Sequence, residues 1–68
     1  MKRQYVQSSN IRSIGYDASA MILEVEFHDR RVYQYFDVPE SRHQGIMQAS
    51  SHGKYLNNYI KGYYQYKQ

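Results

Sequence analysis

The sequence contains no cysteine and no tryptophan, and it has one proline and four glycines. The absence of cysteine excludes disulfides, thiol catalysis and cysteine-ligated zinc, and it fits a reducing cytosol. No apolar run approaches the ~20 residues that a membrane helix needs. The polar segment Met1–Gln7 also lacks the apolar stretch of a signal peptide. We therefore expect a cytoplasmic protein that does not contact a membrane.

Acidic residues are confined to the first part of the chain. Residues 1–40 hold all six acids and five of the nine Lys and Arg residues, whereas residues 41–68 hold four cations and no acid. A basic C-terminal half favours an anionic partner. The nine tyrosines fit two interpretations, namely a small core built from amphipathic rings or an aromatic recognition surface.

The length of 68 residues allows one domain, which we assign to residues 1–68. A chain this short buries only about 60% of its unfolded surface, so its stability is expected to be marginal. We expect residues 1–7 to fray or to add an edge strand. Ile11–Tyr16 is predicted to be a strand, and Gly15 within it indicates a bulge or a close approach of another backbone.

The clearest pattern is a predicted antiparallel hairpin. Apolar residues alternate along Met21–His28, the segment HDRR interrupts them, and Val32–Phe36 is again β-branched and aromatic. This hairpin and the preceding strand are expected to form a meander. The chain therefore belongs to the α+β class, as a small antiparallel meander of three to five strands with one or two helices packed on one face.

The register of this hairpin has two alternatives. A two-residue turn places Phe27 opposite Val32 and a glutamine in the core. One extra, bulged residue places Phe27 opposite Tyr33 and Val25 opposite Tyr35, and we favour it because it buries two rings and no amide. In the first register the tyrosines share a face with two glutamates, and in the second they fill the core. In neither register are they expected to stack on bases.

Helical signals follow Pro39, which suits the first helical position, with Asp37 or Val38 as the cap. This helix is expected to reach about Ala49. Its Gly45 is expected to let a neighbouring ring or backbone approach.

A second helix is predicted over His52–Lys61, capped by Ser50 or Ser51 and ended by Gly62. Beyond it, Tyr64 and Tyr66 alternate as in a last strand.

No catalytic constellation is present. His28, His43 and His52 show no metal-binding spacing, and SSHGK lacks the spacing of a phosphate-binding loop. Glu24 and Glu26 are expected to be solvated carboxylates on one strand face. We therefore expect no enzyme, no metal and no cofactor.

Our first hypothesis is a non-catalytic RNA-binding module. The start of the second helix, at Gly53 and Lys54, resembles an anion site. Alternatively, Gly53 permits close packing, Lys54 is solvated, and Tyr55 and Tyr59 belong to the core. In the RNA hypothesis cations neutralise phosphates, asparagines bond sugar or base, and tyrosines stack. The candidate residues are Arg42, Lys54, Asn57, Asn58, Lys61, Tyr64 and Tyr66.

Ser8–Tyr66 resembles the KTSC domain, a small bacterial and phage domain that also occurs at the C-terminus of some lysyl-tRNA synthetases. The resemblance rests on the Y-x-Y pair Tyr33 and Tyr35 and on the stretch S-x-G-x-Y-L-N over Ser51–Asn57. The family has no established activity, and its occurrence in lysyl-tRNA synthetases suggests a tRNA-associated RNA-binding role. A tyrosine-rich patch that docks on a partner protein, or on a second copy, is the alternative function.

This chain departs from the family pattern at the predicted turns. Ala20, Arg30 and Arg31 stand where the family shows glycines nearby, which leaves the turn types open. The family tends to have an aromatic residue in the place of His43, so His43 is expected at the edge of the core.

Overall fold

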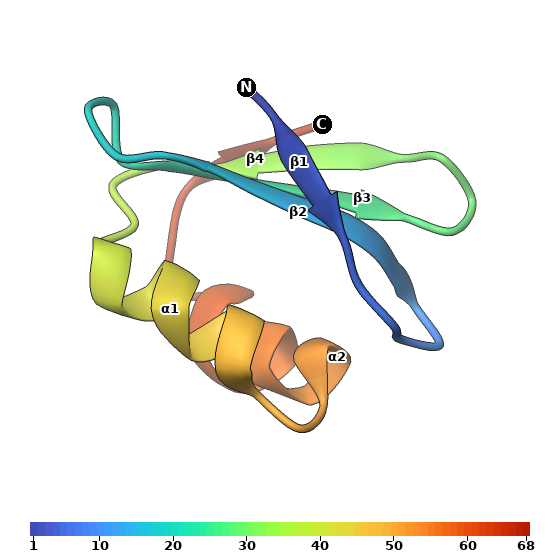
Figure 1. The fold of residues 1–68 in the computed structure, drawn as a ribbon. Helices are drawn as coiled ribbons and strands as arrows, with labels where there is room; N and C mark the ends of the chain where they lie inside the picture. The colour runs from blue at the N-terminus through green and yellow to red at the C-terminus, as the bar shows by residue number, and fades with distance from the viewer.

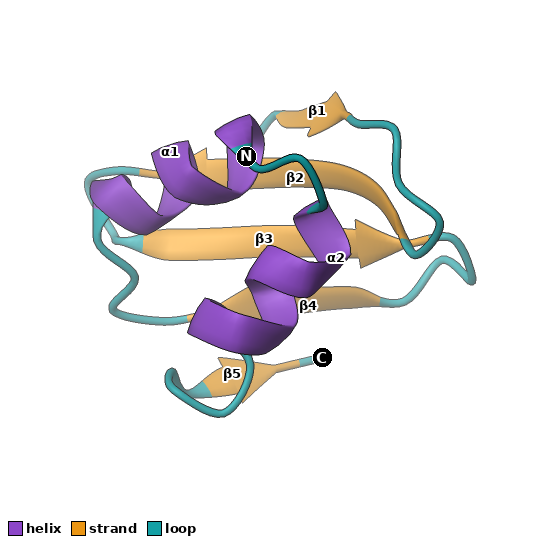
Figure 2. Ribbon diagram, turned by 90° about the horizontal axis from the view of Figure 1, so that it is seen from below, coloured by secondary structure: helices purple, strands orange, loops and turns teal.

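The computed structural model describes all 68 residues as two layers, a five-stranded sheet with helices on one of its faces (Figures 1 and 2). The strands are antiparallel and lie in chain order, so the sheet is a simple meander. The predicted α+β class is confirmed. In order, the elements are β1 (Arg3–Tyr5), β2 (Ile11–Asp17), β3 (Ile22–Phe27), β4 (Val32–Tyr35), α1 (Glu40–Gln48), α2 (His52–Tyr55), a π-helix η1 (Leu56–Ile60) and β5 (Tyr66–Lys67).

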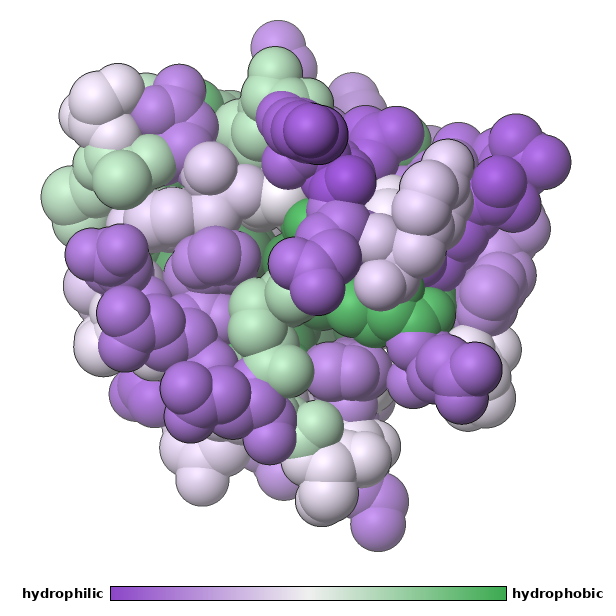
Figure 3. Space-filling view, viewed as in Figure 1, coloured by the Kyte–Doolittle hydropathy of each residue, from purple (hydrophilic) through white to green (hydrophobic).

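The core lies between the sheet and the helices. Every second side chain of the strands faces the helices, as the pleat requires, and in the space-filling view strongly apolar atoms lie in the seam between the two layers (Figure 3). No helix is long and apolar enough to cross a membrane. The nine buried hydrophobic residues are Ile11, Ile14, Leu23, Val25, Tyr35, Val38, Ile46, Leu56 and Ile60.

Both predicted registers of the β3–β4 hairpin are wrong, although its two tyrosines do face the core side. Val25 lies opposite Tyr33 rather than Tyr35. The reason is a three-residue loop: Arg30 has φ 73° and donates its N–H to Phe27 O at 2.9 Å, and the Phe27 N–H bonds Arg31 O at 2.9 Å. A turn followed by one left-handed residue is a common hairpin connection. Relative to the register that we favoured, it shifts the partner of each β3 residue by two positions along β4.

The two ends of the chain form the two edges of the sheet. β1 pairs with β2, and β5 pairs with β4 through Tyr66 opposite Tyr35, as the predictions of an edge strand and a last strand allowed. A Cβ at Gly15 would lie 3.0 Å from the Lys2 O, so the predicted close approach of another backbone is confirmed. The irregularity in β2 lies between Ile11 and Ser13 instead.

α1 begins one residue later than predicted. Pro39 is its cap residue and stays extended, at φ −70° and ψ 156°, while Asp37 has φ 58° and caps nothing with its side chain. The predicted end near Ala49 is confirmed. At Gly45 an added Cβ would overlap the Tyr55 hydroxyl, so glycine is required there for the ring of Tyr55 to approach α1.

The second helix starts and stops where the sequence indicates. Ser51 caps it, because its Oγ accepts the Lys54 N–H at 3.3 Å, and Gly62 follows it at φ 88°. Its second half is a π-helix rather than an α-helix, closed by the Lys61 N–H on Leu56 O at 2.8 Å. Both Leu56 and Ile60 reach the core from this wider turn.

Candidate nucleic-acid interface

The helices leave one end of the sheet uncovered, where the β1–β2 loop and the β3–β4 turn lie side by side (Figure 2). The two loops are joined by the His28 N–H, which bonds Asn10 O at 3.0 Å. A hollow of about 680 Å³ opens here between the sheet and η1, and we call it the aromatic cleft. Its lining residues are Ser9, Asn10, Phe27, His28, Asp29, Arg31, Tyr33, Tyr35, Leu56, Asn57, Lys61 and Tyr66.

Four rings form the floor of the aromatic cleft. Tyr33 meets Phe27 edge-on at 5.5 Å and stacks on Tyr66 at 5.5 Å with an interplanar angle of 19°. Tyr35 is buried in the core, and burial raises its pKa to about 12. Tyr66 is 59% exposed although Tyr33 covers part of its ring. Tyr66 therefore offers the accessible aromatic surface, and Tyr33 supports it from below.

Cations and amides surround this floor. Arg31 and Lys61 are exposed, as are the side chains of Asn10 and Asn57. Asp29 is the one carboxylate in the lining, and its Oδ2 lies 3.2 Å from the Arg31 Nε. An aromatic floor with cations and amides at its rim can hold a flat, polar ring whose substituents carry negative charge.

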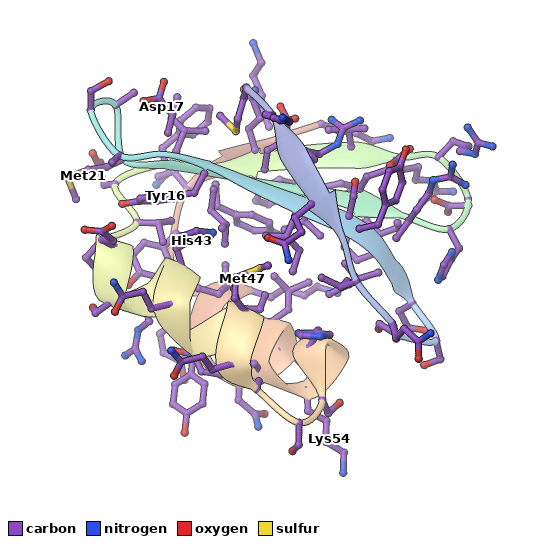
Figure 4. All side chains as sticks on the ribbon, viewed as in Figure 1. Tyr16, Asp17, Met21, His43, Met47 and Lys54 are labelled. Atoms are coloured by element: carbon purple, nitrogen blue, oxygen red, sulfur yellow. The ribbon has the colours of Figure 1, made fainter.

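A second hollow of about 400 Å³ adjoins the aromatic cleft, and we call it the polar hollow. It has no hydrophobic lining residue and no carboxylate, and it shares Ser9, Asn10 and Asn57 with the aromatic cleft. Lys54 is exposed at its side and projects from α2 away from the sheet (Figure 4). The lining residues are Gln7, Ser8, Ser9, Asn10, Ser50, Ser51, His52, Gly53, Lys54 and Asn57.

The chain matches the model of the KTSC domain over residues 7–64. It belongs to the KTSC domain family. An uncharacterised protein of Stutzerimonas stutzeri is 44% identical over 61 residues, which are 90% of this chain and 86% of that protein. The KTSC domain protein of Yersinia pestis, known from a crystal structure, is 43% identical with a TM-score of 0.96, covering 98% of this chain and 94% of that one.

The family also contains parts of larger enzymes. A lysine–tRNA ligase of Nostoc punctiforme is 34% identical over 62 residues, which are 91% of this chain and 11% of the ligase. A lysine–tRNA ligase of Trichormus variabilis gives the same identity and the same coverage. The KTSC domain is thus a small segment of these ligases, and most of the ligase has no counterpart in this chain.

The structure brings together four of the seven residues that the sequence singled out in this KTSC domain. Lys61 and Tyr66 line the aromatic cleft, Lys54 lines the polar hollow, and Asn57 lines both. The other three, Arg42, Asn58 and Tyr64, line neither hollow.

Arg42 is engaged elsewhere. Its guanidinium lies 4.9 Å from the centre of the Tyr59 ring, and it donates to the Tyr55 hydroxyl at 3.4 Å. Hydrogen bonds to the hydroxyls of Tyr55 and Tyr64 raise the pKa of Arg42 further. Tyr64 is half-buried against the core. Arg42 and Tyr64 therefore belong to a second aromatic cluster, outside the candidate interface.

Sequence reasoning missed several residues of the aromatic cleft, chiefly Asn10, Phe27, Arg31 and Tyr33. Tyr33, which we did not expect to stack on bases, is half-buried, lines the cleft and packs against the ring of Tyr66. The available signal was a row of alternating rings directly after a basic turn. This row of rings can form a cleft because the helices leave the turn end of the hairpin uncovered (Figure 2).

Glu24 and Glu26 lie on the opposite face of the sheet and are only 9% and 8% exposed. The expectation that they are solvated is therefore wrong. Arg3 from β1 donates to the Glu24 Oε2 at 2.6 Å, and Gln34 donates to the Oε1 at 2.8 Å. Burial pushes the pKa of Glu24 up, but the hydrogen bonds from Gln34 and Arg3 and the charge of Arg3 outweigh it, so the pKa is lowered. Ser13 donates to Glu26 at 2.8 Å.

The histidines are placed separately. His43 stacks on Tyr16 with ring centroids 4.7 Å apart, between the sheet and α1 (Figure 4), so its predicted position at the edge of the core is confirmed. Burial lowers the pKa of His43. The His52 Nδ1 lies 2.7 Å from Ile46 O and fixes α2 against α1. No group of three histidine or carboxylate side chains that could hold a metal ion is found.

Proposed function

We propose that this KTSC domain is a non-catalytic module that binds single-stranded RNA in the aromatic cleft. The observation that carries the proposal is the exposed ring of Tyr66, supported by Tyr33 and placed beside the cations Lys61 and Arg31. Single-strand binders combine stacking rings with a positively charged groove along the backbone. The exposed amide of Asn57 is available for hydrogen bonds to an unpaired base.

Charge supports an anionic ligand. None of the four lysines makes an ion pair, whereas three of the four ion pairs in the molecule involve the buried glutamates of the outer face. The occurrence of the domain in lysine–tRNA ligases agrees with an RNA ligand, and among RNAs it favours tRNA. Fusion is a weak argument on its own, so the proposal depends on the cleft.

The test is fluorescence anisotropy with tRNA and with labelled oligoribonucleotides over a range of salt concentrations. Binding is expected to weaken with salt, with a logarithmic slope of about 0.7 for each phosphate contact. Lys61→Gln is expected to lower the affinity and to reduce this slope by about one contact. Lys67→Gln is the matched control, because Lys67 lies opposite Gln34 on the outer face. Absence of binding at low salt contradicts the proposal.

A second candidate function, a protein-interaction module, has its own observation. Tyr59 and Tyr63 are 45% and 71% exposed, and Arg42 packs over the Tyr59 ring. Tyrosine and arginine are enriched at the energetic centres of protein interfaces. A partner protein or a second copy bound there is expected to stay bound in high salt and to be lost in Tyr59→Ala. Light scattering of the wild type and of this variant distinguishes self-association from RNA binding.

A further inference from the structure

We infer that the aromatic cleft and the polar hollow form one continuous groove, in which the cleft takes a base and the hollow takes the phosphates and sugars that follow it. This inference rests on the proposed function, and it extends the site from one nucleotide to a short strand. It also gives Lys54 a role that is separate from that of Lys61.

The two hollows adjoin, because three residues line both. Ser9 and Asn10 line both hollows from the β1–β2 loop, and Asn57 lines both from η1. The loop is held in place by several hydrogen bonds. Ser8 Oγ accepts the N–H groups of Asn10 and Ile11, both at 3.2 Å, and Ser8 O lies 2.7 Å from the His28 Nε2. The junction between the hollows is therefore a built part of the fold.

The two parts of the groove suit different parts of a nucleotide. The aromatic cleft has rings on its floor, and bases stack on rings. The polar hollow has no hydrophobic lining residue. Its one ring is the imidazole of His52, whose Nδ1 is engaged with Ile46 O at 2.7 Å. The hydroxyls and amides of this hollow and the ammonium of Lys54 are groups that bond phosphate and ribose oxygens. No carboxylate lines this part to repel a phosphate.

The arrangement predicts that affinity depends on strand length. A dinucleotide seated at Tyr66 fills the aromatic cleft, and its phosphate lies near Lys61. Only a longer strand reaches past Asn10 and Asn57 to Lys54. Lengthening the strand should therefore raise the affinity, and the part of this gain that Lys54 provides should depend on salt.

The experiment measures the anisotropy of labelled oligouridylates, from a dinucleotide to roughly eight nucleotides, a length within the known range for single-strand binding domains. In the wild type the affinity is expected to rise with length. Lys54→Gln is expected to reduce this gain by about threefold or more and to lower the salt slope of the longest strand by about 0.7. Lys61→Gln is expected to weaken the binding of the dinucleotide and of the longest strand alike. Lys67→Gln, on the outer face, is the control.

Each result separates the two claims. If Lys61→Gln weakens binding and Lys54→Gln leaves the gain with length unchanged, the groove ends at the aromatic cleft and this inference is wrong, while the proposed function stands. If no oligonucleotide binds at low salt, both are wrong. Amide chemical shifts give a second measurement: Gly53 and Lys54 are expected to shift with the longest strand, and shifts confined to the aromatic cleft contradict the continuous groove.

Discussion

Arg3 and Arg12 on the outer face of the sheet are paired with buried carboxylates, whereas Lys54 and Lys61 on the helix side make no ion pair. Arg3, Ser13 and Gln34 donate hydrogen bonds to the two glutamates, and the Arg12 Nε lies 3.6 Å from the Glu26 Oε1. The lysines are exposed to solvent. Charges of the first kind fix β1 on the sheet, and charges of the second kind remain available to a ligand.

This difference explains why the basic C-terminal half of the sequence was a poor guide to the residues of the interface. The basic half of the sequence includes Arg42, which packs on Tyr59, and it excludes Arg31, which lines the aromatic cleft. The role of a cation depends on which residues surround it in the fold, and these neighbours depend on the topology. If the comparison is right, variants on the two faces should change different measured quantities, affinity on one and stability on the other.

Tyr66→Ala is the variant expected to have the largest effect on the cleft. Loss of the stacking ring should weaken binding of single-stranded RNA by about 1–3 kcal/mol. The free energy of unfolding should change little, because the ring is 59% exposed. Tyr63→Ala is the matched control, since Tyr63 is 71% exposed and lines neither hollow. Equal loss of affinity in both variants contradicts a specific stacking role.

Glu24→Ala tests the other face. It leaves the Arg3 Nη1 and the Gln34 amide without their acceptor, so it should lower the free energy of unfolding by about 1–2 kcal/mol, measured by urea denaturation. The figure is modest because Arg3 is 31% exposed and can bond water instead. RNA affinity should stay at the wild-type value. Glu40→Ala, at an exposed helix start, is the control and should cost less.

Acid should weaken the same network. Because the pKa of Glu24 is lowered from its ordinary value of 4.5 in the folded state, its contribution to stability is complete above that value. The contribution is lost as the pH falls below 4.5 through the lowered pKa. Glu24→Gln should therefore show a smaller loss of stability than the wild type between about pH 5 and pH 3, measured by thermal unfolding. Identical acid profiles would falsify this role.

Much of the fold could be predicted because it depends on local patterns. Alternation along β3 and β4 gave the hairpin, and Ser51 and Gly62 bounded the second helix. The hairpin register could not be predicted in this way. It depends on Arg30 adopting φ 73°, a conformation that its side chain does not favour and that the surrounding sheet imposes.

The site was harder to predict, because its parts are distant in sequence. Tyr33 lines the cleft because the second helix, which runs from α2 toward β5, leaves the turn end of the hairpin uncovered (Figure 2). Glu24 is buried on a central strand, where Arg3, 21 residues away, reaches it from β1. Neither fact follows from the local pattern of β3 or β4. Lys61 and Tyr66 were found because residue type alone suggests their chemistry.

The smallest expected effect, and the one that links the two kinds of charge, concerns Asp29. Asp29 forms an ion pair with Arg31, as the glutamates of the outer face do with their arginines. Both side chains of this pair are more than half exposed, however, and they lie at the rim of the aromatic cleft. Asp29→Asn should raise RNA affinity by about 0.2–1 kcal/mol, because it removes the one negative charge of the lining and frees Arg31 for a phosphate. The turn should persist, since an asparagine oxygen can still accept the Arg31 N–H that Asp29 accepts at 3.1 Å. Asp37→Asn, outside both hollows, should leave the affinity unchanged. Weaker binding in Asp29→Asn would mean that this carboxylate accepts hydrogen bonds from the ligand. Ion-paired charges would then take part in binding, and the division between paired charges that stabilise the fold and unpaired charges that bind the ligand would be wrong.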